Sequence, residues 1–257
     1  MATLFIGLTS CSEDDNQPIS LVDVDNYSIN IIYPRTDAYT INVTGGDGRY
    51  SVNSNNDEVL IATLADGNIL VINPLSTGEA TITINDQSNQ SYTLHVQASY
   101  PEYNYLVTKQ DVTVRGELLT LSEVEEIKKD ALASIPVQAE GGYRIVFTDT
   151  DLSEGEAYLY PDTWGTNGKK GTFERTKTSN EGITEYNYKV TIGGEDRYFV
   201  FLPYSGDLTK NSGDLQQPFL FQENLTEIYK EKYTHVEQVY TSQVLKLKTG
   251  IETKNNQ

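Results

Sequence analysis

Residues 48–97 read GRYSVNSNNDEVLIATLADGNILVINPLSTGEATITINDQSNQSYTLHVQ, and this stretch decides the fold of the first part of the chain. Short segments of alternating apolar and polar residues recur at a spacing of roughly ten residues. Turn-forming residues separate them, such as Asp66-Gly67-Asn68 and the stretch from Pro74 to Gly78. From Ala80 to Ile84 the apolar side chains alternate with threonines, so one face is apolar and the other polar. This pattern predicts an all-β sandwich.

The same stretch resembles a group 2 bacterial immunoglobulin-like domain. The features that carry the resemblance are the segment ending at Val59, the Asp66-Gly67 turn, the run from Gly78 to Thr83 and the alternation Leu94-x-Val96. The resemblance covers about residues 22–97 and implies an Ig-like β-sandwich, which we place at residues 21–98. The resemblance implies no catalytic residues, and the fold by itself does not fix a function. We favour a spacer over a ligand-binding module for this domain.

The N-terminus carries the most specific signal. The apolar run Leu4 to Leu8 is too short to span a bilayer but is typical of the end of a signal-peptide hydrophobic region, which we place at residues 1–10. Leu8-Thr9-Ser10-Cys11 resembles the lipobox of bacterial lipoproteins, which implies cleavage before Cys11 and lipidation of its thiol. Met1-Ala2-Thr3 carries no basic residue, so the true start of the signal peptide stays open.

Residues 11–20 are predicted to form a lipidated acidic tether. Ser12-Glu13-Asp14-Asp15 resembles the export tag that follows the lipidated cysteine in surface-exposed lipoproteins of Bacteroidetes. The alternative interpretation is a solvated acidic tether that carries no export signal. The resemblance implies a protein in the outer membrane, attached through the lipid on Cys11 and exposed at the cell surface.

Composition excludes several classes of function. The net charge is −18, from 37 acidic and 19 basic residues, and such a surface repels the phosphate backbone of nucleic acids. The chain has one cysteine, so it cannot form an internal disulfide, and its two histidines make a histidine-rich metal site improbable. We therefore expect no nucleic-acid partner and no resident cofactor.

Beyond a junction near Ser99 to Tyr105 the pattern changes. The stretch from Thr120 to Ile135 predicts a helix that begins with a capping box at Ser122 and Glu125 and ends at Pro136. A meander of strands follows, and Asn224 is predicted to cap a second, short helix. The chain as a whole is predicted to be mainly β, with an α+β domain at residues 103–250 that holds a mostly antiparallel sheet and two helices. Residues 251–257 are predicted to be a flexible tail.

Two segments of this second domain are candidate sites. Asp149, Asp151 and Ser153 have the alternate spacing with which one loop can surround calcium, but no bidentate acid follows at the twelfth position, so a polar turn is the favoured interpretation. Tyr158, Tyr160 and Trp164 lie close in sequence to Asp162 and Asn167. Flat rings beside short polar side chains are typical of a sugar-binding face, whereas strand packing by these rings is the competing interpretation.

The sequence contains no G-x-S-x-G, H-E-x-x-H, phosphate-loop or C-x-x-C motif. We therefore expect a non-enzymatic surface lipoprotein that binds an extracellular ligand, either a glycan or a host surface molecule. The alternatives are an accessory subunit of an envelope complex and, with less support, a glycan-active hydrolase using paired carboxylates.

Overall fold

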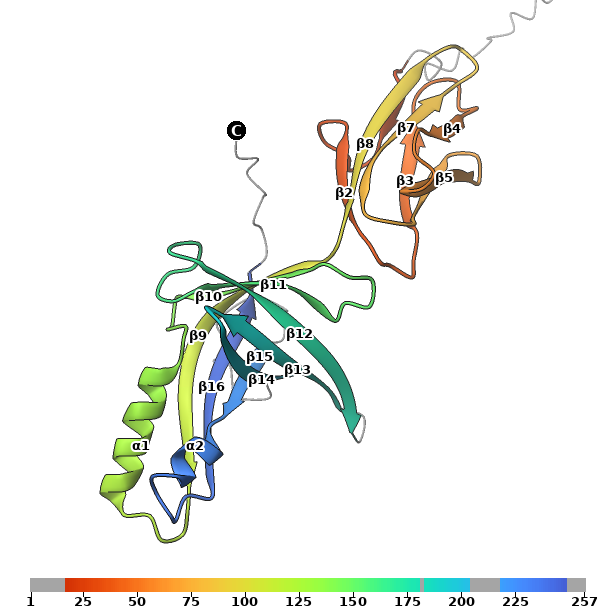
Figure 1. The fold of residues 1–257 in the computed structure, drawn as a ribbon. Helices are drawn as coiled ribbons and strands as arrows, with labels where there is room; N and C mark the ends of the chain where they lie inside the picture. Colours follow the sequence, from red (N-terminus) through yellow and green to blue (C-terminus); the bar gives the residue numbers. More distant parts are fainter. Residues whose placement is uncertain (1–16, 181–182, 204–217, 249–257) are drawn as a thin grey trace, which may run out of the picture. The chain divides into compact units, whose positions relative to one another are not determined.

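The computed structural model describes residues 17–180, 183–203 and 218–248 of the chain. The chain divides into two compact units, Met1–Pro101 and Glu102–Gln257 (Figure 1). Cys11, the predicted signal peptide at residues 1–10, the acidic residues after Cys11 and the predicted tail at 251–257 lie outside the described residues. The two units are described separately below.

The first unit is built from two four-stranded sheets, with strand orders β1-β3-β6-β5 and β2-β8-β7-β4. All pairings are antiparallel except that of β2 with β8, which is parallel. The strands are β1 (Ser20–Leu21), β2 (Ser28–Ile32), β3 (Tyr39–Thr44), β4 (Ser51–Ser54), β5 (Leu60–Ala65), β6 (Ile69–Pro74), β7 (Gly78–Asn85) and β8 (Ser91–Ser99).

Alternation along these strands makes the core of the first unit. In β7 the side chains of Ala80, Ile82 and Ile84 are buried, whereas the threonines between them are half-exposed. Leu94 and Val96 of β8 are buried in the same cluster, which also takes in residues of the other sheet such as Leu70 and Ile72. The apolar side chains of the two sheets therefore share one hydrophobic core, which provides the main driving force for folding of this unit.

The second unit is a closed barrel of eight strands in the order β10-β11-β12-β13-β14-β15-β16-β9. Every strand pairs antiparallel with its neighbour, and the pairing of β16 with β9 closes the barrel. The strands are β9 (Glu102–Arg115), β10 (Gly142–Phe147), β11 (Glu154–Tyr160), β12 (Lys169–Asn180), β13 (Ile183–Ile192), β14 (Glu195–Pro203), β15 (Phe219–Asn224) and β16 (Gln238–Leu247).

The described part of the chain is therefore mainly β with largely antiparallel sheets and two helices, as the sequence predicts at that level. The sheet of the second unit is closed into a barrel, which the expected α+β arrangement did not include. Closure requires β9 and β16 to pair, and their paired residues, such as Arg115 and Gln238, are far apart in the sequence. A pairing between such distant segments leaves no local pattern in the sequence.

Strand β9 itself was not predicted, and its geometry gives the reason. Tyr105 and Val107 are buried, and so is Val112, but the alternation does not continue regularly between them. The register with β16 shifts by one residue between Val244 and Leu245, which pair with Lys109 and Val107 respectively. Such a β-bulge moves the buried face from odd to even positions, so the alternation typical of one strand is broken.

Aromatic rings fill the interior of the barrel. Tyr143, Phe147 and Phe173 are at most 1% exposed, and rings from neighbouring strands lie against one another. The ring centroids of Phe199 and Phe221 are 4.2 Å apart in a stacked arrangement. Eight strands leave room for side chains or for one small ligand, and in this barrel the side chains take up the space.

Two helices, α1 (Leu121–Ser134) and α2 (Thr226–Lys230), lie beside the lower part of β9 and β16 (Figure 1). Ile127 and Ala131 of α1 are fully buried in a cluster that also holds Val112 and Val239, whose side chains come from β9 and β16. The helices therefore cover one end of the barrel. No helix within the described ranges is both long and apolar enough to cross a membrane.

The capping box of α1 differs from the predicted one. The hydroxyl of Thr120 accepts from the Glu123 N–H at 3.3 Å, and the Glu123 carboxylate accepts from the Thr120 N–H at 2.8 Å. The predicted pair, Ser122 and Glu125, has the same spacing, so spacing alone cannot choose between them. The earlier pair is used because Leu119, directly before it, is packed against the core formed by α1, α2, β9 and β16.

The predicted second helix is shorter than expected. It was expected to run from Asn224 to about residue 233, whereas α2 ends at Lys230. The Asn224 side chain accepts from the Thr226 N–H at 2.9 Å, although Leu225 occupies the cap position and its side chain cannot bond the helix. The asparagine therefore caps the first turn from one residue further away than the sequence predicts.

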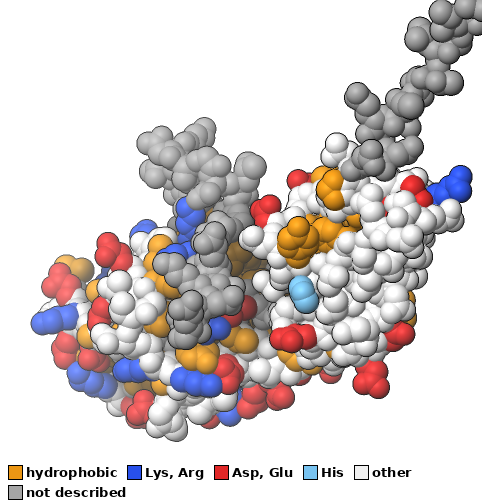
Figure 2. All heavy atoms as spheres, turned by 90° about the horizontal axis from the view of Figure 1, so that it is seen from above, with side chains coloured by type: hydrophobic (Ala, Val, Ile, Leu, Met, Phe, Trp, Pro, Cys, Tyr) orange, Lys and Arg blue, Asp and Glu red, His pale blue; other side chains and the backbone are white. Residues whose placement is uncertain are grey.

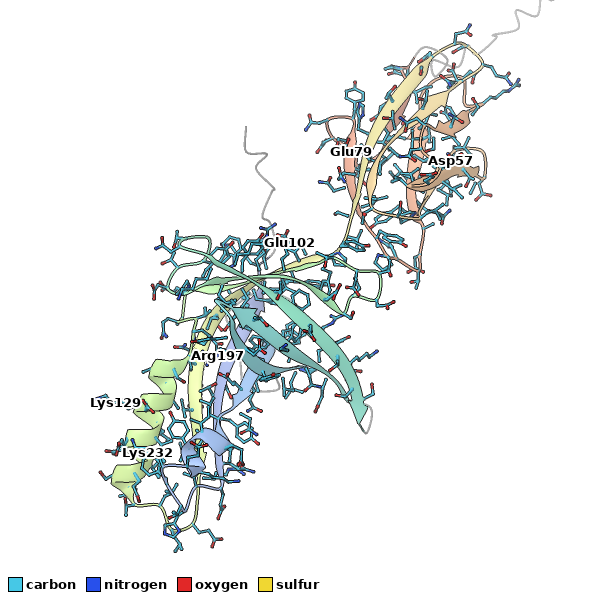
Figure 3. The ribbon with its side chains drawn as sticks, viewed as in Figure 1. Asp57, Glu79, Glu102, Lys129, Arg197 and Lys232 are labelled. Atoms are coloured by element: carbon cyan, nitrogen blue, oxygen red, sulfur yellow. The ribbon has the colours of Figure 1, made fainter. Side chains whose placement is uncertain are left out.

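Polar side chains hold the segment after α1 across the barrel end. Gln110 and Gln243 both donate to the carbonyl of Val137, at 2.7 Å and 2.6 Å, and the Tyr143 hydroxyl donates to Gln243 at 2.6 Å. Arg197 donates to the carbonyl of Ser134 at 2.8 Å, near the C-terminal end of α1 (Figure 3). The polar groups buried here are thus satisfied by one another, which burial requires.

Candidate functional site

The structure brings Tyr160 and Trp164, two residues of the predicted aromatic cluster, into contact. Their ring centroids are 5.1 Å apart, with the planes tilted by 46°. Trp164 packs closely over Gly142 of the neighbouring strand, where a Cβ atom would lie 2.4 Å from the indole ring. The backbone N–H of Trp164 donates to the carbonyl of Glu140 at 2.9 Å, and the Lys248 ammonium lies 4.4 Å from the indole ring centroid. Packing against the barrel wall therefore occupies much of this ring.

Tyr158 belongs to a different set of contacts. Its hydroxyl donates to Glu156 at 2.7 Å, and the guanidinium of Arg144 lies 4.9 Å from its ring. Lys170 pairs with Glu156 at 2.6 Å, and Arg144 pairs with Glu102 at 2.8 Å. These ion pairs already occupy the charged groups around the Tyr158 ring.

Asp162 and Asn167 are exposed in the segment between β11 and β12. In the part of the chain that the structure describes, neither side chain makes a hydrogen bond to the rings of the predicted cluster. Asn167 has a φ of +51°, a left-handed conformation that asparagine tolerates in turns. The five predicted residues therefore do not form one continuous surface of rings and amides.

The predicted calcium loop is organised around one carboxylate. Asp149 accepts hydrogen bonds from the Ser153 hydroxyl at 2.7 Å, from the Ser153 N–H at 2.9 Å and from the Glu154 N–H at 3.1 Å. Asp151 is exposed and does not join this set. Among the described residues no group of three or more histidine, cysteine, aspartate or glutamate side chains could hold a metal ion. The geometry is that of a polar turn.

We expect the Asp149 turn to stabilise the fold in a pH-dependent way. Burial alone would raise the pKa of Asp149, but hydrogen bonds from Glu154 and Ser153 outweigh it and hold the pKa below its ordinary value. A depressed pKa gives a contribution that is present above about pH 4 and is lost as the pH falls through the folded-state pKa. Asp149→Asn should cost about 1 kcal/mol at neutral pH and less at about pH 3.

Urea unfolding of wild type and Asp149→Asn at both pH values measures this difference. Calcium or a chelator should change neither result, because the carboxylate is already occupied by its own loop. A stability difference that grows towards acid pH would contradict this explanation.

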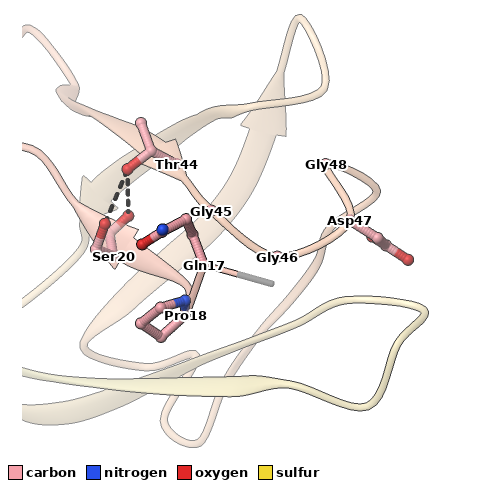
Figure 4. Close-up of a pocket in the computed structure, with 8 residues that line it drawn as sticks. All are labelled: Gln17, Pro18, Ser20, Thr44, Gly45, Gly46, Asp47 and Gly48. Carbon is pink, nitrogen blue, oxygen red and sulfur yellow. Dashed lines mark hydrogen bonds between the residues drawn. The ribbon is translucent and has the colours of Figure 1, made fainter. Parts of the chain in front are cut away.

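A cavity of about 570 Å³ lies in the first unit, where the described chain begins (Figure 4). Its walls are Gln17, Pro18 and Ser20 on one side and the stretch from Thr44 to Gly48 on the other. The Ser20 and Thr44 hydroxyls bond each other at 2.9 Å, and Asp47 points away from the cavity in Figure 4. Backbone and small side chains make up most of this surface, which offers no aromatic ring to orient a ligand.

A second cavity, of about 420 Å³, is a groove on the outer face of the barrel. It crosses β12, β13 and β14, and we call it the outer groove. The strand register places Lys189 opposite both Glu174 and Tyr198, and Asn187 opposite both Thr176 and Val200. The lining residues are Glu174, Thr176, Asn187, Tyr188, Lys189, Tyr198, Phe199, Val200 and Asn224.

The outer groove combines an exposed ring with fixed polar groups. Tyr198 is 63% exposed, so its ring is available to a ligand. Lys189 lies 3.3 Å from Asp196 and 3.5 Å from Glu174, and hydrogen bonding and attraction to these acids, Asp196 foremost, raise its pKa. The Lys189 ammonium therefore stays charged and is held in position near the ring.

The sequence interpretation missed Tyr198, although a signal was present. In β14 the buried residues Phe199 and Phe201 alternate with Tyr198 and Val200, which places the latter two on the outside. An aromatic residue on the solvent side of a strand is unusual enough to single out. The polar residues that surround it come from β12 and β13 and from the end of β15, and only the pairing register brings them together.

Comparisons with known proteins give no family assignment for this chain. No family model matches the sequence. A search of curated proteins likewise finds no significant match.

Proposed function

We propose that this protein is a non-enzymatic, lipid-anchored bacterial surface protein that binds a glycan in the outer groove of its barrel. The observation that carries the proposal is the exposed Tyr198 ring in a groove lined by Asn187, Thr176 and the ion-paired Lys189. Sugars present apolar C–H faces that stack on aromatic rings, while their hydroxyls bond amides and charged groups. A preformed groove of this composition suits a saccharide.

The filled centre of the barrel favours an outer site for the glycan over a site deep in the interior. Tyr143 and Phe221 are 5.2 Å apart in the interior, and Phe147 and Phe173 are 5.1 Å apart. A ligand could enter that space only by displacing well-packed rings, at a cost comparable to opening a cavity in a core.

Binding rather than hydrolysis is supported by the acidic groups. Among the described residues, hydrogen bonds or ion pairs hold the pKa of seven carboxyl groups below its ordinary value: Asp86, Glu102, Glu123, Glu126, Asp149, Glu156 and Asp196. A glycosidase needs one carboxyl group with a raised pKa to protonate the leaving oxygen.

We further propose that the first unit is a group 2 bacterial Ig-like domain that serves as a spacer on a tether lipidated at Cys11. The two sheets with a shared core, and the placement of Gly78 to Thr83 in β7, support this assignment. Acidic and basic side chains are interspersed on the visible face of the barrel unit (Figure 2), within a chain of net charge −18. A glycan or a protein is therefore a more suitable extracellular partner than a polyanion.

The proposal is tested with a glycan array probed by the full chain. Wild type should bind at least one glycan, and Tyr198→Ala should weaken that binding about ten-fold or more, because stacking on the ring is lost. Tyr27→Ala is the matched control, since Tyr27 is 61% exposed on the first unit, and it should bind like wild type.

Binding that Tyr198→Ala leaves unchanged would contradict the assignment of the groove. Trp164→Ala, tested on the same array, decides whether the predicted aromatic cluster takes part instead.

A second candidate function is an accessory subunit of an envelope complex. Three large apolar side chains at the helical end of the barrel are exposed: Leu118, shortly before α1, is 70% exposed, and Leu121 of α1 and Ile228 of α2 are 84% and 64% exposed. Large exposed apolar side chains are typical of surfaces that another protein covers. An array without any bound glycan would favour this second function.

A further inference from the structure

The inner face of β12 carries an arginine, Arg175, at the end of the barrel away from α1. Phe173, two residues earlier on the same face, is buried in the aromatic interior. Tyr103 of β9 lies at the same end of the barrel as Arg175, because both residues contact the ring of Phe147. Val112 of the same strand packs against the helices, and it lies nine residues further on, which corresponds to roughly 30 Å of strand.

Aromatic rings enclose the Arg175 guanidinium. Its Cζ atom lies 4.4 Å from the ring centroid of Phe147 and 4.6 Å from that of Tyr186. Tyr105 and Tyr188 are close enough for their hydroxyls to interact electrostatically with the same guanidinium. Arg175 thus lies within a group of tyrosines, Tyr103, Tyr105, Tyr186 and Tyr188, which we call the tyrosine cage.

Two other arginines of the barrel, Arg144 and Arg197, each bind a glutamate through two hydrogen bonds. Arg144 holds Glu102 with two hydrogen bonds of 2.8 Å each. Arg197 holds Glu223 with bonds of 3.0 Å and 2.5 Å and adds a third bond to a backbone carbonyl. Arg175 forms no ion pair with any carboxylate in residues 17–180, 183–203 and 218–248, although the chain has 37 acidic residues. Unlike Arg144 and Arg197, the Arg175 guanidinium is therefore not neutralised by a carboxylate of the described residues.

The solvent-facing side of the tyrosine cage is formed by Tyr103, which is 36% exposed, and by Arg175 and Tyr186, which are half-buried. Tyr105 and Tyr188 are buried beneath them. Burial raises the pKa of Tyr105 and of Tyr188, so both hydroxyls keep their protons at neutral pH and can donate. A guanidinium presents five N–H donors in a planar fork that matches a carboxylate. The cage therefore offers an anion one charge, several donors and flat apolar walls.

We infer that Arg175 and the tyrosine cage form a second binding site, which takes the carboxylate of an acidic sugar. The guanidinium binds the carboxylate through two N–H donors, as Arg144 and Arg197 bind glutamate. The tyrosine hydroxyls donate to the remaining oxygens, and the ring faces contact the sugar C–H groups. The outer groove lies on the opposite face of the same strands, and Tyr188 is the one residue that lines the groove and also belongs to the cage.

Isothermal titration of the full chain tests this site, with glucuronate as the probe and glucose as the neutral comparison. Wild type should bind glucuronate and not glucose at this site, and raising the salt concentration should weaken the binding. Arg175→Gln should lower the affinity about ten-fold or more, and Arg175→Lys should fall between, because a lysine keeps the charge without the fork.

Arg35→Gln is the matched control, because the Arg35 guanidinium lies 4.2 Å from the Tyr39 ring in the first unit. It should leave the affinity for glucuronate unchanged. Tyr198→Ala should also leave it unchanged, so failure of the outer groove and failure of this site are distinguishable. Tyr188→Phe keeps the ring, removes one donor and should weaken binding even if Arg175→Gln does not fold.

Three results would overturn the inference. One is the absence of glucuronate binding to wild type, and another is equal binding of glucose and glucuronate. The third is an affinity for glucuronate that Arg175→Gln and Tyr188→Phe, both folded, leave unchanged.

Discussion

Phe221→Ala should lower the free energy of unfolding of the barrel by about 3–5 kcal/mol. Phe221 is 4% exposed, and its ring lies among four others, those of Phe199, Tyr143, Tyr188 and Phe201. Removing the ring takes contacts from all of them at once, and the rigid barrel wall limits how far they can close the cavity. These rings come from three different strands, β10, β13 and β14.

Trp164 is the only tryptophan in the chain and belongs to the barrel unit, so its fluorescence reports on barrel unfolding. Urea titration followed at this residue gives the change in free energy. Tyr198→Ala, on the outside of the adjacent strand, is the control and should change stability by less than about 0.5 kcal/mol. A loss below about 1 kcal/mol for Phe221→Ala would contradict a tightly packed interior.

Arg197→Met should cost about 3–5 kcal/mol, because it leaves the carboxylate of Glu223 buried without its partner. Glu223 is 7% exposed and receives two hydrogen bonds from Arg197. The same substitution also removes the bond from Arg197 to the carbonyl of Ser134. The end of α1 would then be held less firmly at the barrel.

Arg144→Met is the matched control, since Arg144 and Glu102 form a two-bond pair of the same kind, but the Glu102 side chain is 31% exposed. Solvent can replace the lost partner there, so the expected cost is at most about 1 kcal/mol. The double variant Arg197→Met with Glu223→Leu should regain much of the lost stability, because no buried charge remains. Equal losses for Arg197→Met and Arg144→Met would show that burial of Glu223 is not the cause.

Local chemistry made the helices and many of the strands predictable. The apolar spacing and the terminal proline predict the helix that is α1, and the alternation around Ala80 to Ile84 predicts the strand that is β7. These signals act over a few residues, so they appear directly in the sequence. The choice between two equivalent capping boxes depended on where Leu119 packs, which is a tertiary effect.

Barrel closure was not predictable in the same way. The bulge near Lys109 interrupts the alternation of β9, so the sequence does not reveal this strand. β9 begins the second unit and pairs with β16, the last strand, which closes the barrel. Without β9 the remaining strands read as an open meander with two helices. The fold class was therefore predictable at the level of mainly antiparallel β, and the closed topology was not.

The candidate sites show a related limit. The closeness of Tyr158, Tyr160 and Trp164 in the sequence predicts a cluster, yet Trp164 packs against Gly142 of another strand. Tyr198 and Arg175 each appear in the sequence as a single residue in an alternating strand. Their neighbours come from adjacent strands, and only the register reveals the groove outside and the cage inside.

An NMR titration of the full chain with a glycan selected on the array tests the central claim most directly. We expect the amide signals of β12, β13 and β14 to shift, with the largest changes at Asn187, Lys189 and Tyr198. Signals that shift only around Trp164, or only in the first unit, would contradict the proposal that the outer groove binds the glycan.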